Sequence, residues 1–563
     1  MPNEQRPMHE RRNMAKISGA RAIVEVLNEE GVRYVFHLPG SQIIDILDEI
    51  YQSPIRAIMT RHEQGAAFMA DGYARATRGP GVCLSTVGPG AVNLVSGIAA
   101  SYKASIPVIA ITGVHDQKIL ERDSFHEIDQ VGIFKPITKW SACIHQPDKI
   151  PEMLRKAFRI ALAGRKGPVH LAIPSDVSGG TLNYESSDPS RYRPAVPTAC
   201  PDEVVGEIVN LMERARFPVI LAGGEVLWSR AGTSLVELAE ALEVPVATIR
   251  DQPDAFPITH PLGVGLIGKG RGEAGNTVMK QADLILAMGV KFDYQSTRYN
   301  FEIIPQKAKI MHVSIDPEEV GRIYPVEIGV VCDVGTVIKA LVDKVKGKKI
   351  CFGLRKMVEE VKRESQKVRD SEIDLEAFPL RPEAIARTLR ELLPFETIIV
   401  VDGGNFAKHV RRHFEFFETD TFHYPDNFGS VGASFPMSLG VKVACPQRPV
   451  ACLNGDGAYL LNCQELETAV REHINVIVIV FNDFGFGNVR AYQKARLRGR
   501  YMCDHDNPPF GEMARLFKAD GAQVERLDEL KEAVNTGLRT DKPYVIDVIM
   551  TREALEKPGF LGG

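Results

Sequence analysis

Short apolar runs rich in β-branched residues recur along the chain, and stretches with helical spacing of their apolar residues lie between them. A short, continuous apolar run is typical of a parallel strand that is buried on both faces. Strands that alternate with helices indicate α/β layers. We therefore predict parallel strands at Tyr34–His37, Val82–Thr86, Val108–Thr112, Val169–Ile173, Pro218–Ala222, Val244–Thr248, Leu284–Met288, Ile310–Ser314, Thr397–Val401, Val450–Leu453, Val476–Phe481 and Tyr544–Ile549.

Two polar, proline-containing stretches, residues 186–203 and 371–384, divide these strands into three groups. The chain has 563 residues, which is too long for one hydrophobic core. We expect three tandem α/β domains with parallel sheets, over residues 1–190, 200–370 and 380–563. Duplication of one fold in the first and third domains is a hypothesis, although the sequence contains no visible repeat.

The composition indicates which classes of partner and which cellular compartment to expect. Charged residues make up 25% and the net charge is −4, so nothing favours nucleic acid or an anionic membrane as partner. The nine cysteines include no C-x-x-C pair, which fits a reducing compartment. The first 16 residues lack the apolar core of a signal peptide, and no apolar run reaches 18 residues. We expect a cytoplasmic protein.

The most informative motif is Gly455-Asp456-Gly457, which is followed after a helical pattern and a predicted strand by Asn482-Asp483. This order places Asp456 and Asp483 at the carboxyl ends of adjacent strands, where open α/β sheets bind ligands. Carboxylate oxygens suit Mg²⁺, and glycines allow backbone N–H groups to approach a phosphate. An ordinary loop is the alternative interpretation of the glycines.

A second segment, residues 61–75, follows a predicted strand at Ile55–Met59 and opens a helix at Glu63. A carboxylate is favoured at a helix N-terminus, so a structural role is the alternative to a catalytic one.

Together these segments resemble the thiamine diphosphate (ThDP) enzymes of the acetolactate synthase, pyruvate oxidase and benzaldehyde lyase superfamily, and the resemblance covers nearly the whole chain. It implies a pyrimidine-binding domain, a Rossmann-like middle domain and a diphosphate-binding domain. It implies ThDP and Mg²⁺ as cofactors. The metal ligands would be Asp456, Asp483 and the carbonyl of Gly485, with Asn482 as the alternative. Glu63 would face the pyrimidine ring and promote loss of the C2 proton of the thiazolium.

The resemblance also assigns the loops around the cofactor and substrate. Gln42 and His126 are catalytic candidates beside Glu63, and a surface-loop role is the alternative interpretation of His126. We expect His37 to be a core or loop histidine, and His115 is a weaker candidate. Cofactor contacts would come from Pro39, Glu63, Thr86, Asn93, Gly404, Asn405, Val431, Gly455, Asp456, Gly457, Ala458 and Asp483, and substrate contacts from Ser41, Gln42, Phe125, His126 and Tyr492.

Several departures from acetolactate synthases leave the reaction open. His126 stands in place of a glutamine and Tyr492 in place of a tryptophan, and FAD or ADP in the middle domain is left open. We predict a decarboxylase or carboligase of 2-oxoacids, aldehydes or ketones that forms or cleaves a C–C bond next to a carbonyl and gives an acyloin-type product. The alternatives are a true acetolactate synthase, a lyase of 2-hydroxyacyl-CoA or diketone type, and a catalytically silent paralogue that binds nucleotide or a partner.

The two main motifs lie in different predicted domains, yet one cofactor must reach both. In the resembling enzymes a dimer interface meets this requirement, with Glu63 from one subunit and Asp456 and Asp483 from the other. The expected assembly is a homodimer or homotetramer, because a two-fold interface is self-complementary.

Overall fold

The computed structural model describes residues 15–193, 198–268, 272–346, 348, 352–497 and 502–553. The chain forms two compact units: residues 1–70 with 80–195, and residues 71–79 with 196–563. The N-terminal stretch without a signal-peptide pattern lies outside the described residues, except for its last two positions.

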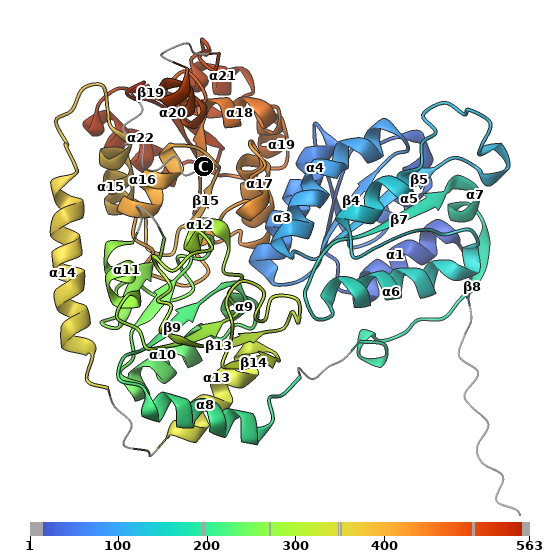
Figure 1. Ribbon diagram of the computed structural model, residues 1–563. Helices are drawn as coiled ribbons and strands as arrows, with labels where there is room; N and C mark the ends of the chain where they lie inside the picture. Colours follow the sequence, from blue (N-terminus) through green and yellow to red (C-terminus); the bar gives the residue numbers. More distant parts are fainter. Residues whose placement is uncertain are drawn as a thin grey trace, which may run out of the picture. The chain divides into compact units, whose positions relative to one another are not determined.

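The first unit contains a six-stranded parallel sheet in the order β3-β2-β4-β5-β7-β6 (Figure 1). Its strands are β2 (Tyr34–His37), β3 (Arg56–Met59), β4 (Gly81–Ser85), β5 (Val108–Val114), β6 (Trp140–Cys143) and β7 (Val169–Pro174). An antiparallel pair, β1 (Ala15–Ser18) and β8 (Thr181–Tyr184), forms a separate small sheet. The main helices are α1 (Gly19–Glu29), α2 (Ile44–Tyr51), α3 (Glu63–Thr77), α4 (Pro89–Ala104), α5 (Gln130–Phe134), α6 (Ile150–Leu162) and α7 (Ser175–Ser178).

Alternate residues of these strands face opposite layers, as the two-residue period of a strand requires. One set, which includes Ile109 and Ile111, packs with α1, α2 and α6 in a buried cluster. The sheet is thus covered by helices, which explains why β5 is buried at every residue and reads as a continuous apolar run.

The second unit contains two six-stranded parallel sheets. The middle sheet has the order β11-β10-β9-β12-β13-β14, formed by β9 (Pro218–Ala222), β10 (Val246–Thr248), β11 (Gly263–Leu266), β12 (Leu284–Met288), β13 (Lys309–Ser314) and β14 (Ile328–Val331). Its helices are α8 (Asp202–Arg214), α9 (Gly224–Trp228), α10 (Gly232–Leu242), α11 (Glu273–Met279), α12 (Tyr294–Thr297), α13 (Val334–Val345) and α14 (Arg355–Ser371). Counted along the chain, this order is 3-2-1-4-5-6, the Rossmann order.

Helices cover both faces of the middle sheet. Leu284, Leu286 and Met288 pack against α8, α10 and α13, whereas Ile285 and Ala287 pack against α11 and α14. The alternation of burial partners along β12 shows that each strand residue contributes to one of two cores.

The last sheet has the order β16-β15-β17-β18-β20-β19, formed by β15 (Ile398–Val401), β16 (Phe422–His423), β17 (Val450–Gly455), β18 (Ile477–Asn482), β19 (Asp520–Val524) and β20 (Tyr544–Ile549). Its helices are α15 (Pro382–Leu392), α16 (Phe406–His413), α17 (Ser434–Ala444), α18 (Asp456–Asn462), α19 (Glu465–Arg471), α20 (Gly487–Arg496), α21 (Phe510–Leu516) and α22 (Leu527–Arg539). Counted along the chain, the first and last sheets share the order 2-1-3-4-6-5. The expected likeness of the first and third folds is therefore present in their topology.

The predicted fold class is confirmed: three α/β sheets, each parallel throughout. Every predicted strand is present within two residues of its expected bounds. The sequence did not predict β1, β6, β8, β11, β14, β16 and β19, all of which lie at a sheet edge.

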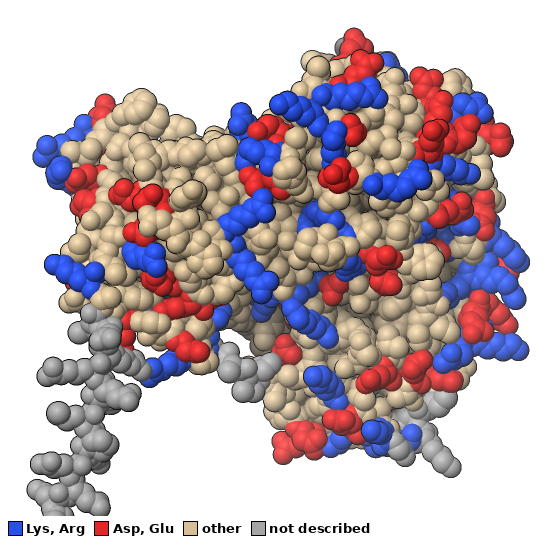
Figure 2. Space-filling model, turned by 180° about the vertical axis from the view of Figure 1, so that it is seen from behind, with Lys and Arg blue, Asp and Glu red and all other residues tan. Residues whose placement is uncertain are grey.

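The surface carries both signs of charge. Figure 2 shows Lys and Arg interspersed with Asp and Glu over the face that it displays. Among the described residues, every helix is too short or too polar to span a bilayer.

Candidate active site

The last sheet reverses its strand order at β15 and β17, because later strands extend from both sides of this pair. Open α/β sheets bind ligands at the carboxyl ends of strands at such a point. A cavity of about 290 Å³ is lined by the loops that follow β15, β17 and β18. Except for the alternative metal ligand Asn482, its lining includes the residues that the resemblance assigned to cofactor or metal in this part of the chain: Gly404, Asn405, Val431, Gly455, Asp456, Gly457, Ala458, Asp483 and Gly485.

Asp456 and Asp483 follow neighbouring strands whose ends are in register, since Gly455 pairs with Phe481. Both residues are buried, with 1% and 8% of their surface exposed. The Asp456 carboxylate accepts hydrogen bonds from the backbone N–H groups of Gly457 and Gly485, each at 2.9 Å. This second bond fixes the loop after β18 against the loop after β17, as the sequence pattern anticipated.

Burial raises the pKa of both carboxyl groups above the usual range. For Asp483 the pKa rises to about 7, first through desolvation and then through the nearby negative charge of Asp456. Two buried carboxylates that repel each other favour the approach of a cation.

Arg490, which the sequence did not single out, partly neutralises this pair. Its Nη1 donates to Asp483 Oδ2 at 2.9 Å, and its Nε donates to Asp504 Oδ1 at 2.6 Å. Asn507 was also missed: its Nδ2 donates to Asp456 Oδ2 at 2.7 Å and to Asn482 Oδ1 at 2.9 Å. Both ends of the Asn482 amide are therefore occupied, because its Oδ1 accepts from Asn507 and its Nδ2 donates to Asp547 Oδ1 at 2.9 Å. These contacts favour Asp483 over Asn482 as the group available to a cation.

In the first unit, the strand order reverses at β2 and β4, and the predicted residues gather around this point. Glu63 is the first residue of α3 and is 5% exposed. Its Oε2 accepts a hydrogen bond from Asn93 Nδ2 at 3.0 Å. A Cβ added to Gly90 would lie 3.1 Å from Glu63 Oε1 and 2.8 Å from Thr86 Cγ2, so this glycine gives the carboxylate its space. The structure therefore joins Glu63, Thr86 and Asn93.

Gln42 connects the loop after β2 to two other segments. Its Oε1 accepts from Ser41 Oγ at 2.9 Å and from Thr86 Oγ1 at 2.7 Å. Its Nε2 lies 3.4 Å from His115 Nδ1, and the other ring nitrogen of His115 bonds the carbonyl of Phe125. His115, a weak candidate in the sequence, thus links Gln42 to the loop that carries Phe125.

The remaining predicted residues are placed as follows. The His126 ring stacks on Phe125 at 3.6 Å, and the His126 backbone packs against Gly88. Pro39 is exposed and His37 is buried at the end of β2, as expected for a core histidine. Tyr492 lies on α20 under the guanidinium of Arg496 and does not line the cavity after β17.

The middle sheet reverses its order at β9 and β12, and a carboxylate lies at that point. Glu225, near the start of α9, accepts hydrogen bonds from Ser314 Oγ at 2.6 Å and from the Ile315 N–H at 2.7 Å. Its stem lies against Gly289 at the end of β12. Burial raises the pKa of this carboxyl group.

Three parallel α/β sheets and an acidic, glycine-lined cavity at a switch point define a class of enzyme that binds a phosphate-bearing cofactor. Comparison with known families is specific about the cofactor. Residues 17–133 match the thiamine pyrophosphate enzyme N-terminal TPP binding domain, residues 205–341 the central domain, and residues 402–548 the C-terminal TPP binding domain.

Individual relatives agree. The chain is 34% identical over 549 residues to the probable acetolactate synthase large subunit of Methanocaldococcus jannaschii, covering 95% of this chain and 92% of that protein. It is 33% identical over 531 residues to the acetolactate synthase large subunit of Haemophilus influenzae, and the match covers 92% of this chain and 91% of that protein. It is 30% identical over 552 residues to the acetolactate synthase isozyme 3 large subunit of Escherichia coli, and this match covers 95% of each protein. The chain belongs to the thiamine diphosphate-dependent enzymes, in the acetolactate synthase family.

The residues of the cavity fit ThDP and Mg²⁺. The donor set suits a hard cation, with two carboxylates and the Gly485 backbone at the same edge. The buried Asn405 side chain lines the cavity, and its Oδ1 has no hydrogen-bond partner among the described residues. No group of three or more His, Cys, Asp or Glu side chains suited to a metal is found in the described part of the chain. Mg²⁺ sites that use one or two carboxylates and substrate phosphates need no such group.

Proposed function

We propose that the protein is a ThDP- and Mg²⁺-dependent enzyme that decarboxylates a 2-oxoacid and joins or cleaves a C–C bond next to a carbonyl. The observation that carries this proposal is the acidic pair Asp456 and Asp483 at the edge of a glycine-lined cavity of about 290 Å³, in a chain of this family. Bound ThDP supplies the carbanion chemistry. The protein supplies binding, orientation and proton transfer.

Asp456, Asp483 and the carbonyl of Gly485 would hold Mg²⁺, which in turn would hold the diphosphate. The N-terminus of α18, which begins at Asp456 beside Gly457 and Ala458, offers backbone N–H groups to the phosphate oxygens. Gly404 and Asn405 would contribute from the loop after β15. Val431 would support the ring system from its half-exposed position on the cavity wall, where 42% of its surface is open.

Glu63 would exchange a proton with the pyrimidine ring nitrogen. Its buried position and its bond from Asn93 hold the carboxylate in one orientation. Pro39 and Thr86 would line the pyrimidine side. The network of Ser41, Gln42 and His115 offers hydroxyl and amide groups that would bind a 2-oxoacid carboxylate, with Phe125 and His126 beside it and Tyr492 as a more remote substrate contact.

We also propose that the functional domains span residues 1–190, 200–370 and 380–563. A two-fold dimer would supply Glu63 from one subunit and Asp456 and Asp483 from the other, in a homodimer or homotetramer. Because Glu225 places a carboxylate at the middle switch point, we infer that this edge binds neither FAD nor ADP through a diphosphate. The absence of flavin absorption from the purified protein, before and after incubation with FAD, would agree; uptake of FAD would contradict it.

Acetolactate synthesis is the second candidate, favoured by the names of the relatives. Incubation with pyruvate, ThDP and Mg²⁺ separates the two: acetolactate identifies the synthase, and acetaldehyde or a mixed acyloin identifies the broader reaction. A panel of longer 2-oxoacids then defines the substrate. If no 2-oxoacid is consumed but a 2-hydroxyacyl-CoA or a diketone is cleaved, the protein is a lyase. If ThDP does not bind at all, the proposal fails and a catalytically silent paralogue remains.

A further inference from the structure

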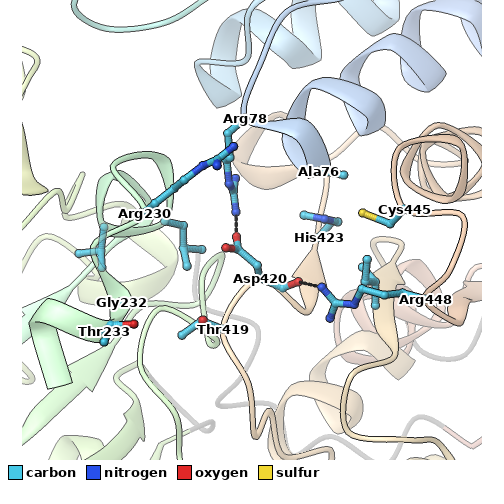
Figure 3. A pocket seen from close by; sticks show the side chains of 13 residues that line it. Ala76, Arg78, Arg230, Gly232, Thr233, Thr419, Asp420, His423, Cys445 and Arg448 are labelled. Atoms are coloured by element: carbon cyan, nitrogen blue, oxygen red, sulfur yellow. Dashed lines mark hydrogen bonds and ion pairs between the residues drawn. The ribbon is translucent and has the colours of Figure 1, made fainter. Parts of the chain in front are cut away.

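A second cavity, of about 430 Å³, lies within the second unit and shares no lining residue with the cavity after β17 (Figure 3). It is enclosed by the C-terminal end of α3, the loop between α9 and α10, the segment around β16 and the loop between α17 and β17. The side chains that matter for its chemistry are Arg78, Arg230, Thr233, Thr419, Asp420 and Arg448.

The lining carries more positive than negative charge. Arg78 pairs with Asp420, the one carboxylate of the described lining. Arg230 Nη2 donates to the carbonyl of Thr77 at 3.2 Å, and Arg448 donates to the carbonyls of Glu396 and Asp420 at 2.9 Å and 3.3 Å. Since carbonyls are neutral, neither of these two guanidinium charges is balanced by a carboxylate among the described residues.

The other titratable groups of the lining do not change this balance. Burial lowers the pKa of His423 well below its usual value, so the ring is neutral at pH 7. Burial raises the pKa of the Cys445 thiol, which therefore stays protonated. Buried Asp254 acts on Arg78 from outside the lining, and desolvation raises the pKa of that carboxyl group to about 6.

The arginines also lie close enough to repel one another. Figure 3 shows the side chains of Arg78 and Arg230 extending toward each other. Burial and the positive charges of Arg75 and Arg230 lower the pKa of Arg78 to about 10. The Nε of Arg78 is buried and has no hydrogen-bond acceptor among the described residues. The negative charge of an anion in the cavity would relieve this repulsion.

Two further features suit an anion with several oxygens. Helix α10 begins at the cavity with Gly232 and Thr233, and no side chain in the described part of the chain caps its N-terminus. Its first N–H groups and the positive end of its dipole therefore face this region. The hydroxyls of Thr233 and Thr419 add neutral donors.

We propose that this cavity binds a phosphate group, either inorganic phosphate or the phosphate of a monoester. Guanidinium groups, helix N–H groups and hydroxyls together match the geometry and double charge of a phosphate. The volume is many times the ~30 Å³ that a water molecule occupies, so an organic portion can accompany the phosphate. This inference is independent of the reaction proposed above.

Isothermal titration calorimetry with inorganic phosphate tests the proposal. The protein is first saturated with ThDP and Mg²⁺ so that the cavity after β17 is filled, and chloride is used at the same ionic strength as the reference. We expect saturable binding of one phosphate per chain. Arg230→Gln should weaken it by about tenfold or more, because a hydrogen bond to a charged group is lost. Thr233→Val should weaken it less.

Arg230 and Thr233 are both exposed, so these changes should leave folding intact. The matched control is Arg363→Gln on α14, where a guanidinium that is 68% exposed is removed outside the cavity lining. Equal losses in Arg230→Gln and Arg363→Gln, or no saturable uptake, would overturn the proposal. Binding of succinate with no binding of phosphate would also overturn it. Tighter binding of glycerol 3-phosphate than of phosphate would identify a monoester as the ligand, and equal binding would identify phosphate itself.

Discussion

Replacing Glu63 by glutamine tests the proton-transfer role most sharply, because the change keeps the shape of the side chain and removes its ability to exchange a proton. Glu63 is nearly buried, and its Oε2 accepts from Asn93 Nδ2 at 3.0 Å. A glutamine can place its carbonyl oxygen at the same position and keep this bond. The loss of a charged acceptor should cost about 1 kcal/mol of folding free energy, so the variant should remain folded.

The expected effect on chemistry is much larger. A positioned acid or base contributes roughly 10²- to 10⁴-fold to a rate. This corresponds to about 3–5 kcal/mol of transition-state stabilisation. The rate of hydrogen–deuterium exchange at C2 of bound ThDP, measured by NMR after rapid quenching, should fall by that factor. The affinity for ThDP, measured by calorimetry, should change by less than about tenfold, since Glu63 forms one contact among many.

Glu225→Gln is the matched control. Glu225 is a partly buried carboxylate that accepts hydrogen bonds from Ser314 and Ile315, but it lies in the middle domain. In Glu225→Gln, the rate of exchange at C2 of bound ThDP should equal that in the unmodified protein. An exchange rate in Glu63→Gln within about threefold of the unmodified enzyme, with ThDP bound, would refute the role of Glu63.

Three further changes follow from the structure. Asp456→Asn should weaken the binding of Mg²⁺ and of ThDP together by at least about tenfold, because even changes to residues that only support a metal ligand cause such a loss. Unaltered affinities in calorimetry would contradict the metal site. Gly90→Ala should slow C2 exchange with little loss of ThDP affinity, because the new methyl group would press on Glu63 Oε1 and Thr86 Cγ2; an unchanged rate would mean that the carboxylate tolerates displacement. Burial lowers the pKa of Lys362 to about 8. Between about pH 8 and about pH 10.4, the unfolded chain therefore binds more protons than the folded chain, and the free energy of unfolding should rise with pH across that window. In denaturant titrations, the free energy of unfolding of Lys362→Met should not show this rise. The same pH dependence in the variant and in the unmodified protein would contradict the prediction.

The central strands could be predicted from sequence because their residues are buried on both faces. β18 is buried at each of its six residues, and its apolar run is visible without any structure. The edge strands that were not predicted give no such signal. β16 has two residues, β14 alternates buried with exposed positions, and β19 contains polar residues, so their pairing depends on neighbours that the sequence alone does not place.

The site shows the same division. The glycine and aspartate motif was sufficient to bring Asp456 and Asp483 to adjacent strand ends, because strand order and loop length leave little freedom there. Arg490 and Asn507 were missed because nothing in their local sequence marks them. Asn507 reaches Asp456 from 51 residues away in sequence, and only the fold brings the two together.

The contact between His115 and Gln42 was not predicted for a similar reason. It spans 73 residues, and both side chains lie in loops that follow parallel strands at one sheet edge. A pattern search that grouped polar residues by the strand they follow would have found it.

The most direct test of the account is calorimetry of ThDP binding to the unmodified protein, with and without Mg²⁺. If Asp456 and Asp483 hold a cation that bridges to the diphosphate, ThDP should bind at one site per chain when Mg²⁺ is present, and chelation of the metal should abolish that binding. Failure to bind ThDP in the presence of Mg²⁺, or equal binding after its removal, would contradict the account.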